Sequence, residues 1–210
     1  MALLFSASAK AQIQKVEPPF WYAGMKRVAA LDCGTNSIRL LIAEENPGAS
    51  TFTEISRKMS IVKLGEGVDK NKAFLPDAIS RTLAALKIFA ADIAEAKVEQ
   101  VRFCATSATR DAQNRDEFLI PVAQILGITP EVISGEEEAQ LIFNAFELLH
   151  IGRQAQYIVV DVGGGSTEIS VFEEGKRRAS QSFELGTLRL LNQKVAPNIW
   201  DTFKTWIQTH

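Results

Sequence analysis

The 210-residue sequence contains few of the residues that characterise several classes of protein. It has two cysteines, too few for a disulfide-stabilised scaffold, and two histidines, too few for a histidine-rich metal site. Its formal net charge is −2, so a general basic surface for nucleic acid is not expected. No apolar run approaches the roughly 18 residues that a membrane-spanning helix needs. These absences favour a globular cytoplasmic protein with no nucleic-acid and no membrane partner.

The first 26 residues show no hydrophobic periodicity that would indicate a helix or a strand. A secretory signal is not expected, because the stretch that begins at Met1 has no basic segment and only a very short apolar run. Met25 stands directly before the first expected strand. We therefore predict that residues 1–26 are a disordered leader and that Met25 is the true start.

A glycine-rich stretch from Asp161 to Glu168 follows an apolar run at 157–160, which predicts a buried strand, and precedes an alternating run at 169–172, which predicts a second strand. Glycines allow backbone N–H groups to approach an anion closely, and hydroxyl side chains add donors. Carboxylates at both ends of the turn suit a phosphate whose charge is bridged by Mg²⁺. The residues expected to donate hydrogen bonds to a phosphate are Gly163, Gly164, Gly165, Ser166 and Thr167. A glycine hairpin without a ligand is an equally acceptable interpretation of this stretch alone.

A second copy of the pattern begins at Asp32, again between two apolar runs. In both copies an Asp is followed by any residue, a Gly, two residues and a Ser, so that Gly34 matches Gly163 and Ser37 matches Ser166. Two related hairpins suggest two related domains that face each other. A ligand would then lie in the cleft between them, where pockets commonly form.

The order of expected elements also repeats. Three strands are followed by alternating helices and strands, and the same series then begins again. We expect strands at 27–31, 40–45, 51–63, 100–105, 130–133, 157–162, 169–174 and 179–184. Helices are expected from Pro76, at 118–126, from Ser134, from about Gly186, and along a stripe of Ile199, Phe203, Trp206 and Ile207. This order predicts an α/β fold with one complete domain at 27–150 and an incomplete second domain at 151–210.

Three glutamates begin the helix that follows Ser134, and they differ in what they imply. Ser134 and Glu137 form the spacing of a capping box, and Glu136 suits the positive end of the helix dipole. Glu138 needs another explanation: it is either a structural residue or a carboxylate that faces the cleft and acts as a general base.

Arg110 follows an expected strand, at the end of a sheet where ligands often bind in α/β folds. A guanidinium group matches a phosphate well. The alternative is an ordinary surface arginine.

Cys33 and Arg39 have the spacing of cysteine-dependent phosphatases. In those enzymes the loop leads into a helix, whereas here it leads into an expected strand. Asp32 beside the thiol would raise its pKa. We therefore predict a small buried structural cysteine.

Five motifs, in order along 27–189, resemble those of the exopolyphosphatase and guanosine pentaphosphatase (Ppx/GppA) family. They are Asp32–Arg39, Leu64–Val68, Ala105–Arg110, Ser134–Ala139 and Asp161–Glu168. The resemblance implies the actin/sugar-kinase type of fold, with two ribonuclease-H-like domains around a cleft. It also implies release of terminal phosphate from inorganic polyphosphate, or of the 5′ phosphate from guanosine pentaphosphate, with Mg²⁺ as cofactor.

Site roles follow from the same resemblance. Glu138 would be the base that activates the attacking water, and Asp161 and Glu168 would position metal and water. Phosphates would be held by Gly34, Thr35, Asn36, Ser37, Arg110, Gly163, Gly164, Gly165, Ser166 and Thr167.

Two other functions stay open: a non-catalytic phosphate- or nucleotide-binding module, and an actin-like ATPase or sugar kinase. Because the family's second domain continues beyond the length of this chain, we expect low activity, an open strand edge at 157–162, and self-association, such as a homodimer.

Overall fold

The computed structural model describes residues 27–46, 51–148, 156–174, 176–192 and 195–209. The predicted leader at 1–26, the predicted start at Met25 and the predicted domain boundary at 150/151 lie outside these ranges. Within them, no helix has both the length and the apolar character needed to cross a membrane.

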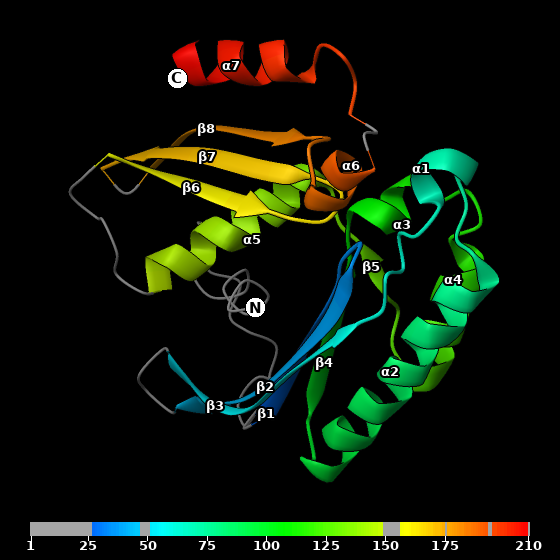
Figure 1. Ribbon diagram of the computed structural model, residues 1–210. Helices are drawn as coiled ribbons and strands as arrows, with labels where there is room; N and C mark the ends of the chain where they lie inside the picture. Colours follow the sequence, from blue (N-terminus) through cyan, green and yellow to red (C-terminus); the bar gives the residue numbers. More distant parts are fainter. Residues whose placement is uncertain (1–26, 47–50, 149–155, 175, 193–194, 210) are drawn as a thin grey trace.

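Five strands form the first sheet, in the order β3-β2-β1-β4-β5 (Figure 1). Strands β1, β2 and β3 pair antiparallel, whereas β4 pairs parallel with both β1 and β5. The first strand is therefore central and the fourth pairs along its free side, which is the strand arrangement of a ribonuclease-H-like domain. The strands are β1 (Arg27–Cys33), β2 (Ser37–Asn46), β3 (Thr51–Ile61), β4 (Gln100–Ala105) and β5 (Glu131–Val132).

The local sequence explains the elements of this first unit. The apolar run 28–31 in β1 is buried, as expected for a strand covered on both faces. Pro76 is the first residue of α2, where its missing N–H costs no hydrogen bond, and α4 ends at Gly127 in the left-handed conformation. The helices are α1 (Val68–Asn71), α2 (Pro76–Glu95), α3 (Ser107–Asp111) and α4 (Asp116–Leu126).

The second sheet has the antiparallel order β6-β7-β8 among the described residues. Its strands are β6 (Tyr157–Val162), β7 (Thr167–Glu173) and β8 (Lys176–Phe183). All three predicted strands are confirmed. The expectation that β6 is a buried strand is wrong for one of its faces, because Ile158, Val160 and Val162 are more than half exposed.

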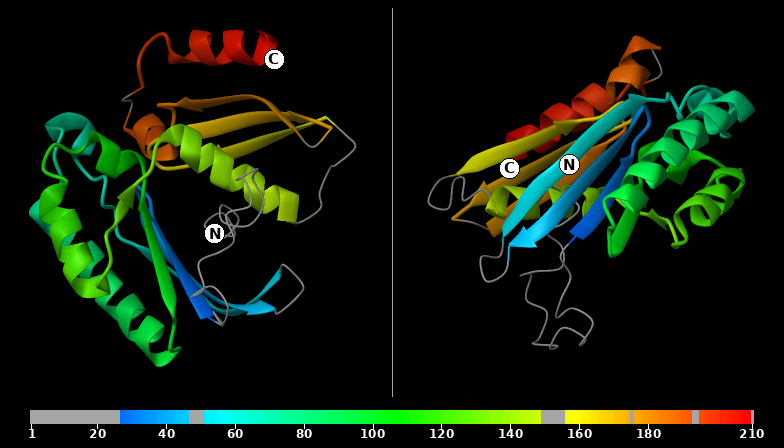
Figure 2. Two further views of the ribbon diagram at one scale, coloured as in Figure 1. Left: turned by 180° about the vertical axis from the view of Figure 1, so that it is seen from behind. Right: turned by 90° about the horizontal axis from the view of Figure 1, so that it is seen from below.

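Helix α5 (Gly135–Leu148) lies between the two sheets (Figures 1 and 2). Leu141 packs in a buried cluster with Ala30 and Cys104 of the first sheet, whereas Phe143 packs with Phe172 of the second. The opposite face of the first sheet is covered by α2 and α4. The layers of the molecule therefore share one central helix, and that helix carries Glu138.

Two helices complete the second unit: α6 (Thr187–Leu191) and α7 (Ile199–Thr209). Ile199, Phe203 and Trp206 of α7 pack on the sheet, beside Phe183, as the predicted stripe requires. Ile207 is 40% exposed and does not belong to that contact.

Candidate active site

A cavity of about 190 Å³ lies where the two glycine turns meet. The first turn joins β1 to β2 and the second joins β6 to β7. Both turns close in the same way: the Gly34 N–H donates to the Ser37 carbonyl over 3.0 Å, and the Gly163 N–H donates to the Ser166 carbonyl over 2.9 Å. The repeated sequence motif therefore produces the same backbone turn twice, which confirms the prediction of two related hairpins.

Most predicted site residues line this cavity. They are Gly34, Thr35, Asn36, Ser37, Glu138, Asp161, Gly163, Gly164, Gly165, Ser166 and Glu168. The two turns also approach each other closely. A Cβ added to Gly165 would lie 2.6 Å from Ser107 Oγ and 2.8 Å from Thr35 Oγ1. Any larger residue at this point would force the Ser107 or Thr35 side chain, or the turn itself, to shift.

The turns leave backbone donors unused. Among the residues that the structure describes, the N–H groups of Thr35, Asn36, Gly164 and Gly165 have no hydrogen-bond acceptor in the protein. The carbonyl groups of the second turn, by contrast, are occupied by α6: the N–H groups of Thr187 and Leu188 donate to Gly163 and Gly164 over 2.9 Å. Unused N–H groups at a glycine turn are suited to bind a phosphate.

Four carboxylates line the same cavity: Asp32, Glu138, Asp161 and Glu168. Asp161 and Glu168 stand opposite each other in the β6–β7 pairing, and Asp32 accepts from Arg39 over 3.1 Å. Asp32 is absent from the predicted set of site residues. Its match to Asp161 in the repeated motif is the signal that would have included it.

Glu138 is held by Arg110, although Arg110 itself does not line this cavity. The Arg110 Nη1 group donates to Glu138 Oε2 over 3.1 Å and to the Ile133 carbonyl over 2.8 Å. Burial, reinforced by the charge of Glu168 and opposed by Arg110, raises the pKa of Glu138 to about 7. A carboxylate with a pKa near neutrality can both accept and release a proton under physiological conditions.

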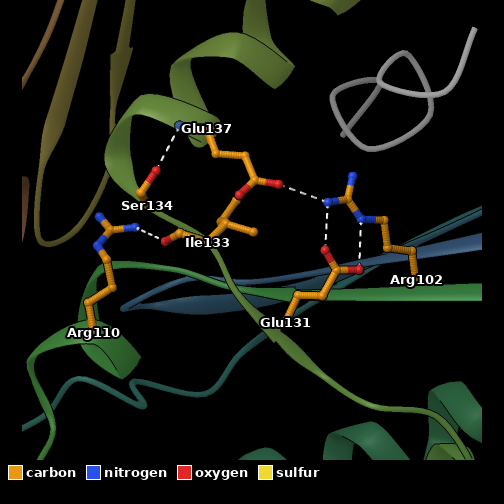
Figure 3. Close-up of polar contacts among 6 residues, drawn as sticks. All are labelled: Arg102, Arg110, Glu131, Ile133, Ser134 and Glu137. Atoms are coloured by element: carbon orange, nitrogen blue, oxygen red, sulfur yellow. Dashed lines mark hydrogen bonds and ion pairs between the residues drawn. The ribbon is translucent and has the colours of Figure 1, made fainter. Parts of the chain in front are cut away.

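The start of α5 is fixed by a separate network (Figure 3). Arg102 binds both oxygens of Glu131, over 3.0 and 2.7 Å, and also donates to Glu137 over 3.0 Å. Ser134 Oγ accepts from the Glu137 N–H over 3.1 Å. The serine half of the predicted capping box is confirmed, but the Glu137 carboxylate binds Arg102 of β4, so that β4, β5 and the first turn of α5 are joined.

Glu168 and Thr167 lie on opposite faces of β7. Glu168 is 3% exposed and accepts from Ser182 Oγ over 2.7 Å, and burial raises its pKa. The Thr167 hydroxyl donates to the Leu185 carbonyl and does not line the cavity. Of the residues of the second turn that were predicted to bind phosphate, all except Thr167 therefore line the cavity.

Three comparisons with known proteins agree with this geometry. The family model described as "Ppx/GppA phosphatase family" matches residues 41–202. The chain belongs to this family. It is 46% identical, over 175 residues, to exopolyphosphatase 2 of Mycobacterium tuberculosis, a match that covers 79% of this chain and 54% of the relative.

Solved structures of Ppx/GppA proteins also superpose on the chain. A family member from Aquifex aeolicus is 34% identical with a TM-score of 0.68, over 80% of this chain and 54% of that one. An exopolyphosphatase from Cytophaga hutchinsonii is 29% identical with a TM-score of 0.72, over 80% and 53%. The predicted actin/sugar-kinase type of α/β fold is confirmed. The chain spans about half the length of the Ppx/GppA relatives that it matches.

The donor set of the cavity can be compared with what Mg²⁺ requires. Among the described residues, no three His, Cys, Asp or Glu side chains are placed to hold a metal ion by themselves. Mg²⁺ is usually held by one or two carboxylates together with water and substrate phosphate. Asp161 and Glu168, paired across β6 and β7 beside the free N–H groups, fit that pattern.

Cys33, the alternative nucleophile, is 1% exposed. Burial and the neighbouring Asp32 raise the pKa of its thiol well above the ordinary value, so the thiolate that a cysteine phosphatase requires is disfavoured. We expect Cys33→Ala to retain phosphate release within about threefold of the parent, and thiol alkylation to leave it unchanged. Loss of release from a folded Cys33→Ala protein, checked by circular dichroism, would restore the cysteine mechanism.

Proposed function

We propose that this chain hydrolyses phosphoric anhydride bonds and releases the terminal phosphate of inorganic polyphosphate. The observation that carries the proposal is Glu138, a carboxylate with a pKa of about 7 in the cavity where two glycine turns present unused N–H groups. A binding module needs the N–H groups but has no use for such a carboxylate. Two of the relatives are named exopolyphosphatases, which supports the same activity.

Different groups bind the phosphate, activate the water and orient the base in the proposed hydrolysis. The N–H groups of Thr35, Asn36, Gly164 and Gly165 bind the terminal phosphate. Glu138 removes a proton from water, the water oxygen forms a bond to phosphorus, and the bond between phosphorus and the bridging oxygen breaks. The shortened chain leaves with the electron pair of that bond. Arg110 orients Glu138 through its hydrogen bond.

Mg²⁺ is the proposed cofactor, with Asp161 and Glu168 as its protein ligands. When bound, it would neutralise part of the phosphate charge. Removal of Mg²⁺ with EDTA should then abolish phosphate release, and added Mg²⁺ should restore it.

An assay of phosphate release distinguishes this function from the two alternative functions. The purified chain is incubated with polyphosphate, guanosine pentaphosphate or ATP, and the free phosphate is measured. Release from polyphosphate supports the proposal. Binding of polyphosphate without release would indicate a non-catalytic module, and hydrolysis of ATP alone would indicate an ATPase or kinase.

A neighbouring cavity favours inorganic polyphosphate over guanosine pentaphosphate. It has a volume of about 670 Å³ and shares Ser107 and Ser166 with the first cavity. Its described lining includes arginines but no aromatic side chain on which a guanine could stack. Arg177 lines it, and the Arg177 Nη1 atom is buried without a hydrogen-bond partner in the described residues. Further phosphates of a chain would occupy this space.

Arg177→Gln should therefore discriminate by chain length. We expect the KM for polyphosphate of several tens of units to rise about tenfold, the cost of a lost charged hydrogen bond, and the KM for tripolyphosphate to stay the same. Arg57→Gln is the matched control, because Arg57 pairs with Glu54 on β3, away from both cavities. An equal rise for the two substrates would contradict the role of this cavity.

Self-association and a cytoplasmic location stay predictions. β6 forms an edge of the second sheet among the described residues, with an exposed apolar face at Ile158, Val160 and Val162. Such edges can pair with another chain. Light scattering of the purified chain measures the oligomeric state directly.

A further inference from the structure

Arg189 is a buried arginine outside the set of predicted site residues. Its side chain is 8% exposed and extends from α6 of the second unit. The Nε group donates to the Gly165 carbonyl over 2.6 Å. The Nη1 group donates to Asp69, and the Nη2 group donates to Asp111 over 2.6 Å.

These three acceptors belong to different parts of the molecule. Gly165 lies in the second glycine turn, Asp69 lies on α1, and Asp111 ends α3. Both aspartates therefore come from the first unit, whereas the turn and α6 come from the second. A single guanidinium group connects the second phosphate-binding turn to the first unit.

The chemistry of the contact makes it specific. A guanidinium group carries five donors in a rigid planar fork, so it fixes the relative positions of several acceptors at once. A buried charge is stable only when it is paired, which holds Arg189 in this arrangement. A lysine would keep the charge but could not reproduce the fork.

The turn does not need Arg189 for its own conformation. The N–H groups of Thr187 and Leu188 already hold the Gly163 and Gly164 carbonyls within the second unit. What Arg189 adds is the position of the turn relative to the first unit, at the place where Gly165 has no room for a Cβ beside Ser107. Thr35 of the first turn and Gly165 of the second, both with unused N–H groups, also meet here, because a Cβ on Gly165 would lie 2.8 Å from Thr35 Oγ1.

We propose that Arg189 is a positioning residue that sets the separation of the two phosphate-binding turns through Asp69, Asp111 and the Gly165 carbonyl. The kinetic part of the inference rests on the proposed hydrolase function. Loss of the contact lets the second turn move away from the first, so that a bound phosphate is held from one side in the wrong orientation for attack.

Kinetics on the full chain test this role. We expect Arg189→Gln to lower kcat by about 10- to 100-fold while KM changes less than about threefold, because misplacement by about 1 Å affects the transition state most. Arg189→Lys should recover only part of the loss. Arg81→Gln is the matched control: Arg81 donates to the Val62 carbonyl and to Glu66, but within the first unit, so kcat and KM should be unchanged.

A distance measurement tests the same role without activity. Cys33 and Cys104 are free and buried, so spin labels can be placed selectively at Ile88→Cys on α2 and Asp201→Cys on α7. The parent should give one narrow distance distribution and Arg189→Gln a broad one, with similar circular dichroism. A narrow, unchanged distribution in Arg189→Gln, or an unchanged kcat, overturns the inference. If the parent releases no phosphate, the proposed function fails, and the width of the distribution still decides the inference.

Discussion

Replacement of Glu138 by Gln is expected to lower the turnover of polyphosphate by about 10²-fold or more, because an amide cannot accept the proton of the attacking water. Glutamine keeps the size of the side chain and its contact with Arg110, so phosphate binding should change little. Phosphate release gives turnover, and calorimetric titration with polyphosphate gives affinity. Full turnover in a folded Glu138→Gln protein would remove Glu138 from the mechanism.

The pH dependence gives an independent check of this prediction. Glu138 must be deprotonated to act as a base, so kcat/KM should rise as pH passes through about 7. Its folded pKa lies above the ordinary glutamate value of 4.5, so the stability that the protonated group contributes is lost as pH rises from about 4.5 to 7. Glu138→Gln should therefore melt above the parent at pH 8, and by less at pH 5.

Glu137→Gln is the matched control, one residue away on the same helix. Glu137 binds Arg102 and its side chain is 46% exposed, so this substitution should cost about 1 kcal/mol of stability or less. Turnover should stay within about threefold of the parent. Equal losses in both variants would show that the effect comes from α5 as a whole.

The second large effect is expected from Gly165→Ala. The added Cβ would lie 2.6 Å from Ser107 Oγ of α3 and 2.8 Å from Thr35 Oγ1 of the first turn, so these side chains or the second turn must shift. Because a shift of about 1 Å in a reacting group costs on the order of 10²-fold in rate, we expect turnover to fall by about that factor. Phosphate binding should change less than turnover, which titration with inorganic phosphate measures.

Gly127→Ala serves as the opposite case. Gly127 ends α4 with a φ of 68°, and nothing lies within 4 Å of the position of an added Cβ. The substitution should cost about 1 kcal/mol of stability because of the left-handed conformation, without loss of turnover. If Gly165→Ala merely lowered the melting temperature in the same way, the close approach of the turns would have no catalytic importance.

The elements and the two turns could be predicted because their signals are local. Each turn combines glycines with a Ser at fixed spacing between alternating strands, and both fold as the motif indicates. Helices α1 and α3 were missed, because four and five residues are too few for a hydrophobic period to develop.

The sequence already contained the information that Thr167 does not face the cavity. Neighbouring residues of a strand point to opposite faces, so Glu168 and Thr167 cannot both face the cavity. Since Glu168 stands opposite Asp161 in the β6–β7 pairing, Thr167 lies on the other face, and its hydroxyl binds Leu185.

Arg189 had no signal of that kind. It is separated from Asp69 by 120 residues and from Asp111 by 78, and no local pattern links an arginine on a short helix to such partners. The contact follows from the packing of two units, which only the folded structure reveals. The same is true of Glu137, whose partner Arg102 lies on another element.

The placement of Arg189 also has a consequence for the time at which the cavity forms during translation. The main core of the first unit uses buried residues between Ala29 and Val122, so it can pack while the later part of the chain is still inside the ribosome. The second turn gains its contact with Asp69 only after Arg189 has emerged. A nascent chain would therefore carry a folded first unit before the two glycine turns are fixed relative to each other, and the geometry needed for attack on phosphorus would form late.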